Sequence, residues 1–170
     1  MSAYDVTVYN PSFHPYKKES FNGVKIQSIY SPQNYIGAAA SNFVFDYLCL
    51  KHAVKQKFDI ILELGLITAA PAIIFCRKGS SIIVTNLDGL EWKRAKWNPI
   101  IRFVTKKLER FGVNSSNYIV ADNIAIQNYV KSRYNKESEF IAYGAEQVSN
   151  LEIATIKKYL IEEGSYILTI

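Results

Sequence analysis

The amino-acid sequence predicts an α/β fold in which a parallel sheet carries helices on both faces. Three observations lead to this prediction. Short runs rich in β-branched and aromatic residues recur along the chain, helical patterns separate them, and the connections between them are short. The 170 residues, of which 49% are hydrophobic, are enough to bury one core. Strands that alternate with helices in this way form parallel sheets with right-handed crossovers.

The first half of the chain predicts three strands and two helices. Residues 4–9 and 23–29 alternate between polar and apolar side chains, which is typical of strands. Residues 38–57 predict a core helix, and residues 68–77 predict another. Between them, residues 58–64 predict a strand buried on both faces. The apolar stripe expected on the first helix consists of Phe43, Tyr47, Leu50 and Val54.

The second half repeats this alternation. Strands are expected over residues 81–85, 117–121 and 139–142. A helix capped by Asn98 should end before Gly112, because asparagine favours helix starts and glycine favours helix ends. The apolar stripe expected on this helix consists of Ile100, Ile101, Val104, Leu108 and Phe111.

One further helix is expected after the strand at 117–121. Asp122 is the predicted N-cap of this helix, because aspartate accepts hydrogen bonds from the first free backbone N–H groups. The inner face expected for this helix consists of Ile124, Ile126, Tyr129 and Val130.

Composition excludes several functional classes. No two of the eight glycines are closer than ten residues apart, which rules out a glycine-rich dinucleotide or phosphate loop. His14 and His52 are isolated from other metal-ligating residues, so we predict neither a metal site nor a bound cofactor in this chain. Cys49 and Cys76 are expected to be buried thiols of a cytoplasmic protein, since no signal peptide is recognisable.

Positive charge is concentrated in one segment. Residues 93–110 contain seven basic residues and one acid, whereas the formal net charge of the whole chain is only +5. One interpretation is a solvated helix face. Another is a peripheral contact with anionic lipid headgroups at the inner face of the cell membrane, where each cation contributes about 1 kcal/mol. A third is a nucleic-acid-binding module in which both tryptophans stack on bases, and we disfavour it.

The segment 88–97 directly follows a predicted buried strand and contains both tryptophans, two carboxylates and three cations. Ligands of open parallel sheets bind at the carboxyl ends of the strands, so this position favours function. Such a loop can supply a base, a stacking surface for a sugar and contacts to phosphate. The alternative is structural: Glu91 pairs with a neighbouring cation, and the tryptophans cover the core.

The run from Asp88 to Trp97 also carries a resemblance, together with the segments 118–122 and 141–145. These motifs resemble the N-terminal domain of bacterial rhamnosyltransferase-like glycosyltransferases, and the likeness extends over residues 4–145. The resemblance implies a Rossmann-like domain of a two-domain (GT-B) retaining enzyme in polysaccharide, capsule or O-antigen synthesis. In such enzymes the N-terminal domain receives a saccharide or lipid-linked acceptor, and the C-terminal domain holds the nucleotide-sugar donor.

The resemblance also implies roles for individual residues. Asp88 lies where related transferases often have a histidine near the acceptor, so Asp88 is the predicted catalytic residue that orients or deprotonates the acceptor hydroxyl. The predicted acceptor-binding residues are Glu91, Trp92, Lys93, Arg94 and Trp97.

Two departures from the family pattern carry expectations of their own. The family begins with a strand that lies between the strands expected here at 4–9 and 58–64. Its absence should make those two strands pair, or leave edges open to an oligomer or a strand-supplying partner. Residues 146–170 are expected to be a linker helix and the opening strand of a truncated second domain. The chain alone is therefore expected to be inactive.

Overall fold

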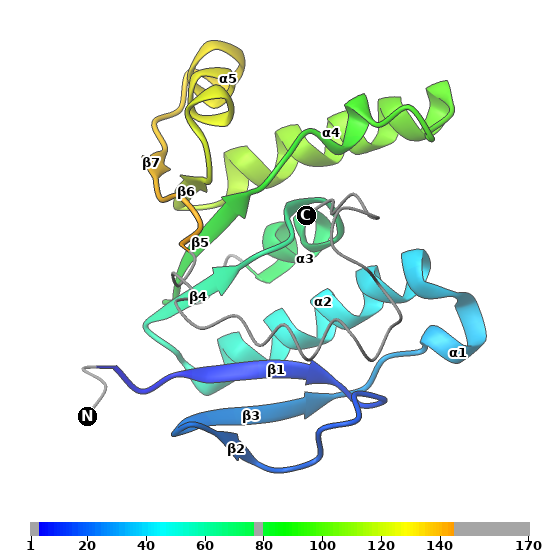
Figure 1. The fold of residues 1–170 in the computed structure, drawn as a ribbon, viewed down its shortest axis with the longest axis vertical. Helices are drawn as coiled ribbons and strands as arrows, with labels where there is room; N and C mark the ends of the chain where they lie inside the picture. Colours follow the sequence, from blue (N-terminus) through cyan, green and yellow to red (C-terminus); the bar gives the residue numbers. More distant parts are fainter. Residues whose placement is uncertain (1–3, 77–79, 145–170) are drawn as a thin grey trace, which may run out of the picture.

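The computed structural model describes residues 4–76 and 80–144, and it contains two separate sheets (Figure 1). The smaller sheet has the order β1-β3-β2. β1 (Thr7–Pro11) runs parallel to β3 (Val24–Ile29), and β2 (Ser20–Phe21) runs antiparallel to β3. The β2–β3 hairpin turns at Asn22 and Gly23, whose φ angles of 48° and 83° suit this tight turn. This hairpin was not predicted from the sequence.

The larger sheet has four strands in the order β4-β5-β6-β7, and all of its neighbouring strands are parallel. They are β4 (Ile60–Glu63), β5 (Ile82–Leu87), β6 (Tyr118–Ala121) and β7 (Glu139–Phe140). A helix connects each strand to the next. The predicted α/β, Rossmann-like fold class is therefore confirmed.

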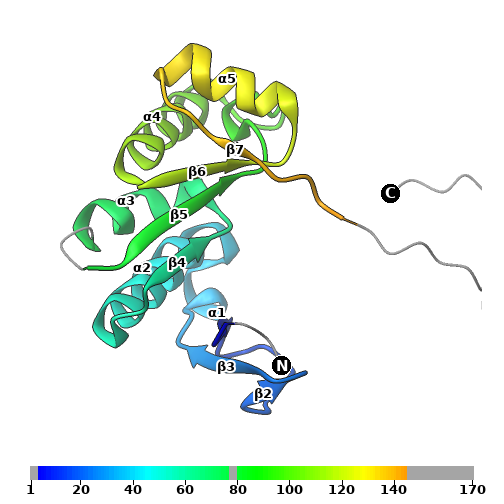
Figure 2. The ribbon, with the colours of Figure 1, turned by 90° about the vertical axis from the view of Figure 1, so that its left-hand side faces the viewer.

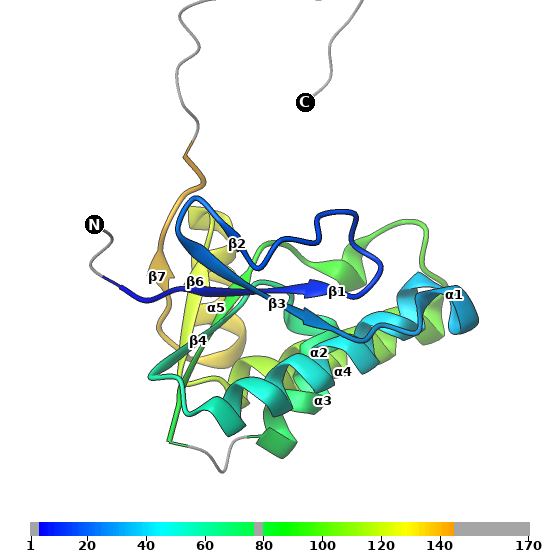
Figure 3. The same ribbon diagram turned by 90° about the horizontal axis from the view of Figure 1, so that it is seen from below.

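The helices are α1 (Gln33–Ile36), α2 (Ala38–Gln56), α3 (Leu66–Cys76), α4 (Pro99–Ser115) and α5 (Ile124–Tyr134). In Figures 2 and 3, α2, α3 and α4 lie together on one side of the larger sheet. Two clusters of buried side chains form the core beneath them. One cluster joins α2 and α3 to β4 and β5, and the other joins α3, α4 and α5 to β5 and β6.

The two faces of the larger sheet differ in cover. On the helical face, Ile83 and Ile119 are 1–2% exposed. On the opposite face, Ile60, Leu62 and Tyr118 are 58–60% exposed. The described helices thus pack on one face only, whereas the sequence predicted helices on both faces. The prediction that residues 58–64 are buried on both faces is wrong for the described structure, because no described element covers the second face.

Two strand edges are unpaired in the described residues, at the place where the family pattern has a further strand. β1 pairs only with β3 and β4 pairs only with β5 among the residues described, although β1 lies between β3 and β4 in Figure 1. The arrowheads of β1, β3 and β4 point the same way in that view, so the carboxyl ends of both sheets lie on one side. Of the two expected outcomes, the structure has unmatched edges. α2 holds the two sheets together, and the Tyr9 hydroxyl lies 2.9 Å from His52 Nδ1.

Gly112 does not end α4 as predicted, because the helix continues to Ser115. Gly112 instead allows α3 to approach: a Cβ atom at this position would lie 2.4 Å from Leu66 Cδ1 and 3.2 Å from Ala70 Cβ. A glycine in a helix can thus mark a close helix contact as well as a helix end.

The predicted apolar stripe of α4 is also wrong. Ile100 is 74% exposed and Phe111 is 53% exposed, whereas the charged residue Glu109 is completely buried. On α2, Leu50 is buried as predicted, but Phe43 and Tyr47 are 37% and 40% exposed. Each helix therefore packs along a narrower face than its apolar residues suggest.

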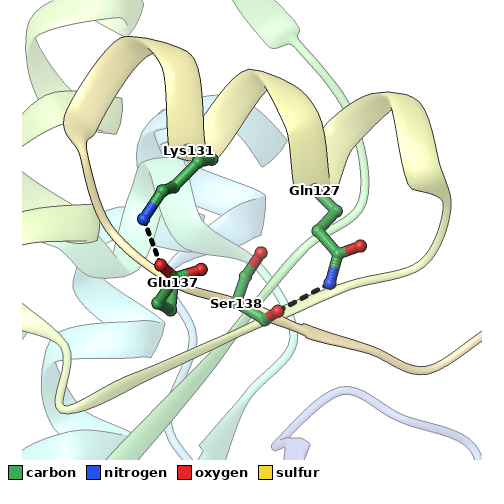
Figure 4. Close-up of polar contacts among 4 residues, drawn as sticks. All are labelled: Gln127, Lys131, Glu137 and Ser138. Carbon is green, nitrogen blue, oxygen red and sulfur yellow. Dashed lines mark hydrogen bonds and ion pairs between the residues drawn. The ribbon is translucent and has the colours of Figure 1, made fainter.

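The start of α5 differs by one residue from the prediction. The cap is Asn123, whose Oδ1 accepts a hydrogen bond from the backbone N–H of Ile126 at 2.9 Å. Two side chains of α5 contact the segment that follows the helix (Figure 4). Lys131 forms an ion pair with Glu137, and Gln127 Nε2 donates to the carbonyl of Ser138 at 2.8 Å. These contacts fix the connection from α5 to β7.

The expected linker helix and strand over 146–170 lie outside the described residues. Within the described ranges, every helix is too short or too polar to cross a bilayer.

Candidate functional site

The segment 88–97 follows β5 at the carboxyl edge of the larger sheet, as the sequence predicts. Its first residue, Asp88, is exposed, and no hydrogen bond or ion pair engages its carboxylate within the described chain. Asn86, two residues earlier in β5, is by contrast held in place. Its side chain is 5% exposed and donates a hydrogen bond to the Tyr143 hydroxyl at 2.9 Å. A rigid strand thus presents a free carboxylate to solvent at the edge where open parallel sheets bind ligands.

Glu91 begins a short 3-10 helix, η1 (Glu91–Lys93), and its carboxylate is already engaged. Glu91 Oε1 lies 2.6 Å from Arg94 Nη2, and the indole N–H of Trp97 points at Glu91 Oε2 over 3.5 Å. Glu91 therefore pairs with a neighbouring cation, as the structural alternative from the sequence analysis expected. Glu91 fixes the shape of the loop by holding Arg94 and Trp97 together.

Trp92 packs against the protein. Its ring lies 6.4 Å from the ring of Tyr129 on α5, and the Lys106 ammonium group lies 4.5 Å from its ring centroid. Behind Tyr129, the buried Glu109 Oε1 accepts hydrogen bonds from the hydroxyls of Tyr129 at 2.6 Å and Tyr134 at 2.5 Å. Trp92 thus attaches η1 to α4 and α5.

The buried Glu109 is stabilised by these donors, because a buried carboxylate without partners is costly. Burial, together with the hydrogen bond to Glu109, raises the pKa of both Tyr129 and Tyr134. Both hydroxyls therefore remain protonated and remain donors. This network explains why a charged residue occupies the inner face of α4, where sequence periodicity predicted apolar side chains.

The remaining predicted acceptor-binding residues lie on the outside of the loop. Lys93 and Arg94 are exposed, and Trp97 is half-buried with the Lys96 ammonium group 4.6 Å from its ring centroid. The guanidinium group of Arg102 reaches the carbonyl of Arg94 at 3.4 Å. Trp92 and Trp97 are both half-buried, and within the described residues only Trp92 has an aromatic neighbour on α5. The role of each of these residues stays a prediction.

A second pair of carboxylates near the strand ends was missed by the sequence analysis. Glu63 ends β4, and Asp46 of α2 is near enough to influence it electrostatically. Burial and, to a smaller extent, the negative charge of Asp46 together raise the pKa of Glu63 to about 7. Burial also raises the pKa of Asp46 to about 6, although a hydrogen bond with Thr68 opposes this shift. The available signal was the position of Glu63 as the polar residue that ends an apolar strand.

These two places differ in what they can do chemically. An exposed carboxylate such as Asp88 can accept a hydrogen bond from a substrate hydroxyl, and the loop cations can meet negative charge nearby. Glu63, with a pKa near neutrality, can hold or release a proton, but it lies on the helical face of the sheet. No group of three His, Cys, Asp or Glu residues in the described ranges is arranged to hold a metal ion.

A family model described as a domain of unknown function, DUF1972, matches residues 3–146. No curated protein matches the chain. The matched range contains both sheets and the whole of the segment 88–97. Because the match covers most of the sequence, the chain belongs to this family of glycosyltransferase-associated N-terminal domains.

Proposed function

We propose that the chain is the acceptor-side domain of a glycosyltransferase of the two-Rossmann-domain type. The complete enzyme transfers a sugar, which the sequence resemblance suggests is rhamnose, from a nucleotide-sugar to a saccharide or lipid-linked acceptor in cell-surface polysaccharide synthesis. The observation that carries the proposal is the free carboxylate of Asp88 at the carboxyl end of β5, next to an aromatic and cationic loop. Membership in a glycosyltransferase-associated family supports it.

In the proposed mechanism Asp88 accepts the hydrogen bond, and then the proton, of the acceptor hydroxyl. The hydroxyl oxygen forms the new bond to the donor sugar as the bond from that sugar to the nucleotide phosphate breaks and the nucleotide leaves. Trp97 offers a ring face for stacking on the acceptor sugar, and Arg94 offers a cation beside it. Glu91 positions both side chains, and Trp92 positions the loop on the helices. The nucleotide-sugar belongs to the second domain of the complete enzyme.

The proposal is tested by NMR of the purified chain, because its two tryptophans give two indole N–H signals. Titration with octyl glycosides of common hexoses should shift the Trp97 signal saturably and move the Trp92 signal much less. A Trp97→Phe variant identifies the signal. Steeply salt-dependent shifts with a dT12 oligonucleotide, and none with glycosides, would support the nucleic-acid-binding alternative and overturn the proposal.

We also propose that α4 rests on an anionic membrane surface, which brings a lipid-linked acceptor within reach. On α4, Ile100 is 74%, Phe103 is 62% and Val104 is 47% exposed. Cations are interspersed with these apolar side chains, and together they form the pattern of interfacial helices. The exposed cations are Arg102, Lys107 and Arg110.

The membrane contact predicts that an Ile100→Ser/Phe103→Ser variant binds vesicles containing phosphatidylglycerol at least tenfold more weakly than the unchanged chain. The matched control is Tyr35→Ser/Ile36→Ser on α1, where the two side chains are 83% and 50% exposed. Vesicle flotation measures both. Equal binding by the α4 variant and the control would exclude α4 as the contact.

A further inference from the structure

A cavity of about 430 Å³ lies beside the carboxyl end of β1, away from the segment 88–97. The loop after β1 and the neighbouring residues of β3 form its walls. This volume is enough for a small polar ligand. Its place at the end of a parallel strand is where ligands of such sheets bind.

The lining of the cavity is cationic and polar. Lys17, Lys18 and Lys25 contribute three positive charges, and Glu19 contributes the one negative charge. The Lys17 ammonium group donates one hydrogen bond to the carbonyl of Ser12 at 2.7 Å, which leaves two of its N–H groups for a ligand. An anion that accepts several hydrogen bonds complements this lining best.

His14 adds a directed neutral donor to the same cavity. Its Nδ1 accepts the backbone N–H of Tyr16 at 3.2 Å, and Asn10 Nδ2 lies 3.5 Å from the same atom. A ring nitrogen that accepts a hydrogen bond carries no proton, so the neutral ring carries its proton on Nε2. The Nε2–H group is therefore a donor whose orientation the loop has already set.

The loop that carries these groups is anchored at both ends. Ser12 N donates to the carbonyl of Ile29 at 2.7 Å, which ties the start of the loop to β3. The Tyr16 hydroxyl donates to the carbonyl of Ser20 at 2.7 Å, and its ring packs edge-on against Phe21. Because these contacts are made within the chain itself, binding requires little ordering of the loop.

We propose that this cavity binds the phosphate group of a phosphate ester or diphosphate. Lys17, Lys18 and Lys25 neutralise its charge, and the Nε2–H group of His14 donates to a phosphate oxygen. Lysine and imidazole N–H groups are hydrogen-bond donors, and phosphate supplies acceptors on every side. The three lysines outnumber the one carboxylate of the lining, Glu19. The ligand comes from a free phosphate compound or from a lipid headgroup. The assignment is independent of the proposed transferase function.

The test is calorimetric titration of the whole chain with inorganic pyrophosphate at constant ionic strength, together with binding to phosphatidylcholine vesicles that contain phosphatidic acid. A Lys17→Gln/Lys25→Gln variant should bind pyrophosphate at least tenfold more weakly. The matched control, Lys51→Gln/Lys55→Gln, removes the same charge from exposed positions on α2 and should change binding less than twofold. His14→Phe should also weaken binding, since it removes the neutral donor.

The two ligands distinguish the source of the phosphate. Pyrophosphate binding that depends on the cavity residues supports a site for free phosphate compounds. Dependence seen only with the phosphatidic acid vesicles supports a lipid headgroup. If the cavity variant and the control variant weaken both interactions equally, the binding reflects net charge, and the cavity is not a phosphate site.

Discussion

Asp88→Asn in a complete transferase that contains this domain is expected to lower turnover at least 100-fold, with little change in affinity for the nucleotide-sugar. Asparagine keeps the size of the side chain but cannot accept the proton of the acceptor hydroxyl, and general base catalysis contributes roughly 10²–10⁴-fold. The turnover number and the donor dissociation constant, measured on the same preparation, separate the chemical step from donor binding.

Two further variants make this result specific. Asp59→Asn removes an exposed carboxylate just before β4, at the opposite edge of the sheet, and should leave turnover unchanged. Glu63→Gln removes the carboxylate whose pKa burial raises to about 7. If Glu63→Gln abolishes turnover and Asp88→Asn does not, the base is Glu63, and the proposed role of Asp88 is wrong.

Gly112→Ala is expected to destabilise the domain by about 1–3 kcal/mol, although alanine is the better helix former by about 1 kcal/mol. The new methyl group would lie 2.9 Å from Leu66 Cγ and 2.4 Å from its Cδ1. Leu66 is 3% exposed, so the surrounding core restricts its movement. Urea unfolding followed by circular dichroism measures the free-energy change.

Gly65→Ala is the matched control, because a Cβ atom at Gly65 has no neighbour within 4 Å. Its free energy of unfolding should stay near that of the unchanged chain. A Gly112→Ala variant as stable as this control would mean that α3 and α4 do not approach as closely as described.

The order of strands and helices was predictable because each signal is local. Strand runs such as 81–85 and the cap at Asn98 depend on neighbours within a few residues, and both were found. Asn22 and Gly23 form an equally local turn signal, and the sequence analysis could have read it. The parallel direction of the strands in the larger sheet also followed, because strands joined by helices form parallel sheets.

The faces of the helices were less predictable, because burial depends on what lies opposite. Periodicity placed Ile100 and Phe111 on the inner face of α4, yet the core beneath α4 accepts Glu109. Its Oε1 accepts hydrogen bonds from Tyr129 and Tyr134 on α5. Neither hydrogen bond is visible before α5 is packed on α4. Similarly, the exposed face of β4 depends on an element that the described chain does not contain.

The position of the candidate site followed from the sequence, whereas the roles within it did not. Asp88 lies at the strand end as predicted, but the different surroundings of Trp92 and Trp97 became visible only in the folded chain. The cavity beside β1 combines residues of the loop after β1 with residues of β3, and only the folded chain brings them to one surface. No single motif could have indicated it.

The central claim, that this domain receives the acceptor, is tested most directly by exchanging residues 3–146 into a two-domain transferase of the same family with a different acceptor. The measurement is the ratio of kcat/KM values for the two acceptors and for the two donors in the hybrid. We expect the acceptor preference of the hybrid to follow this chain and its donor preference to stay with the second domain. An active hybrid in which donor preference follows residues 3–146, or acceptor preference does not, would contradict it.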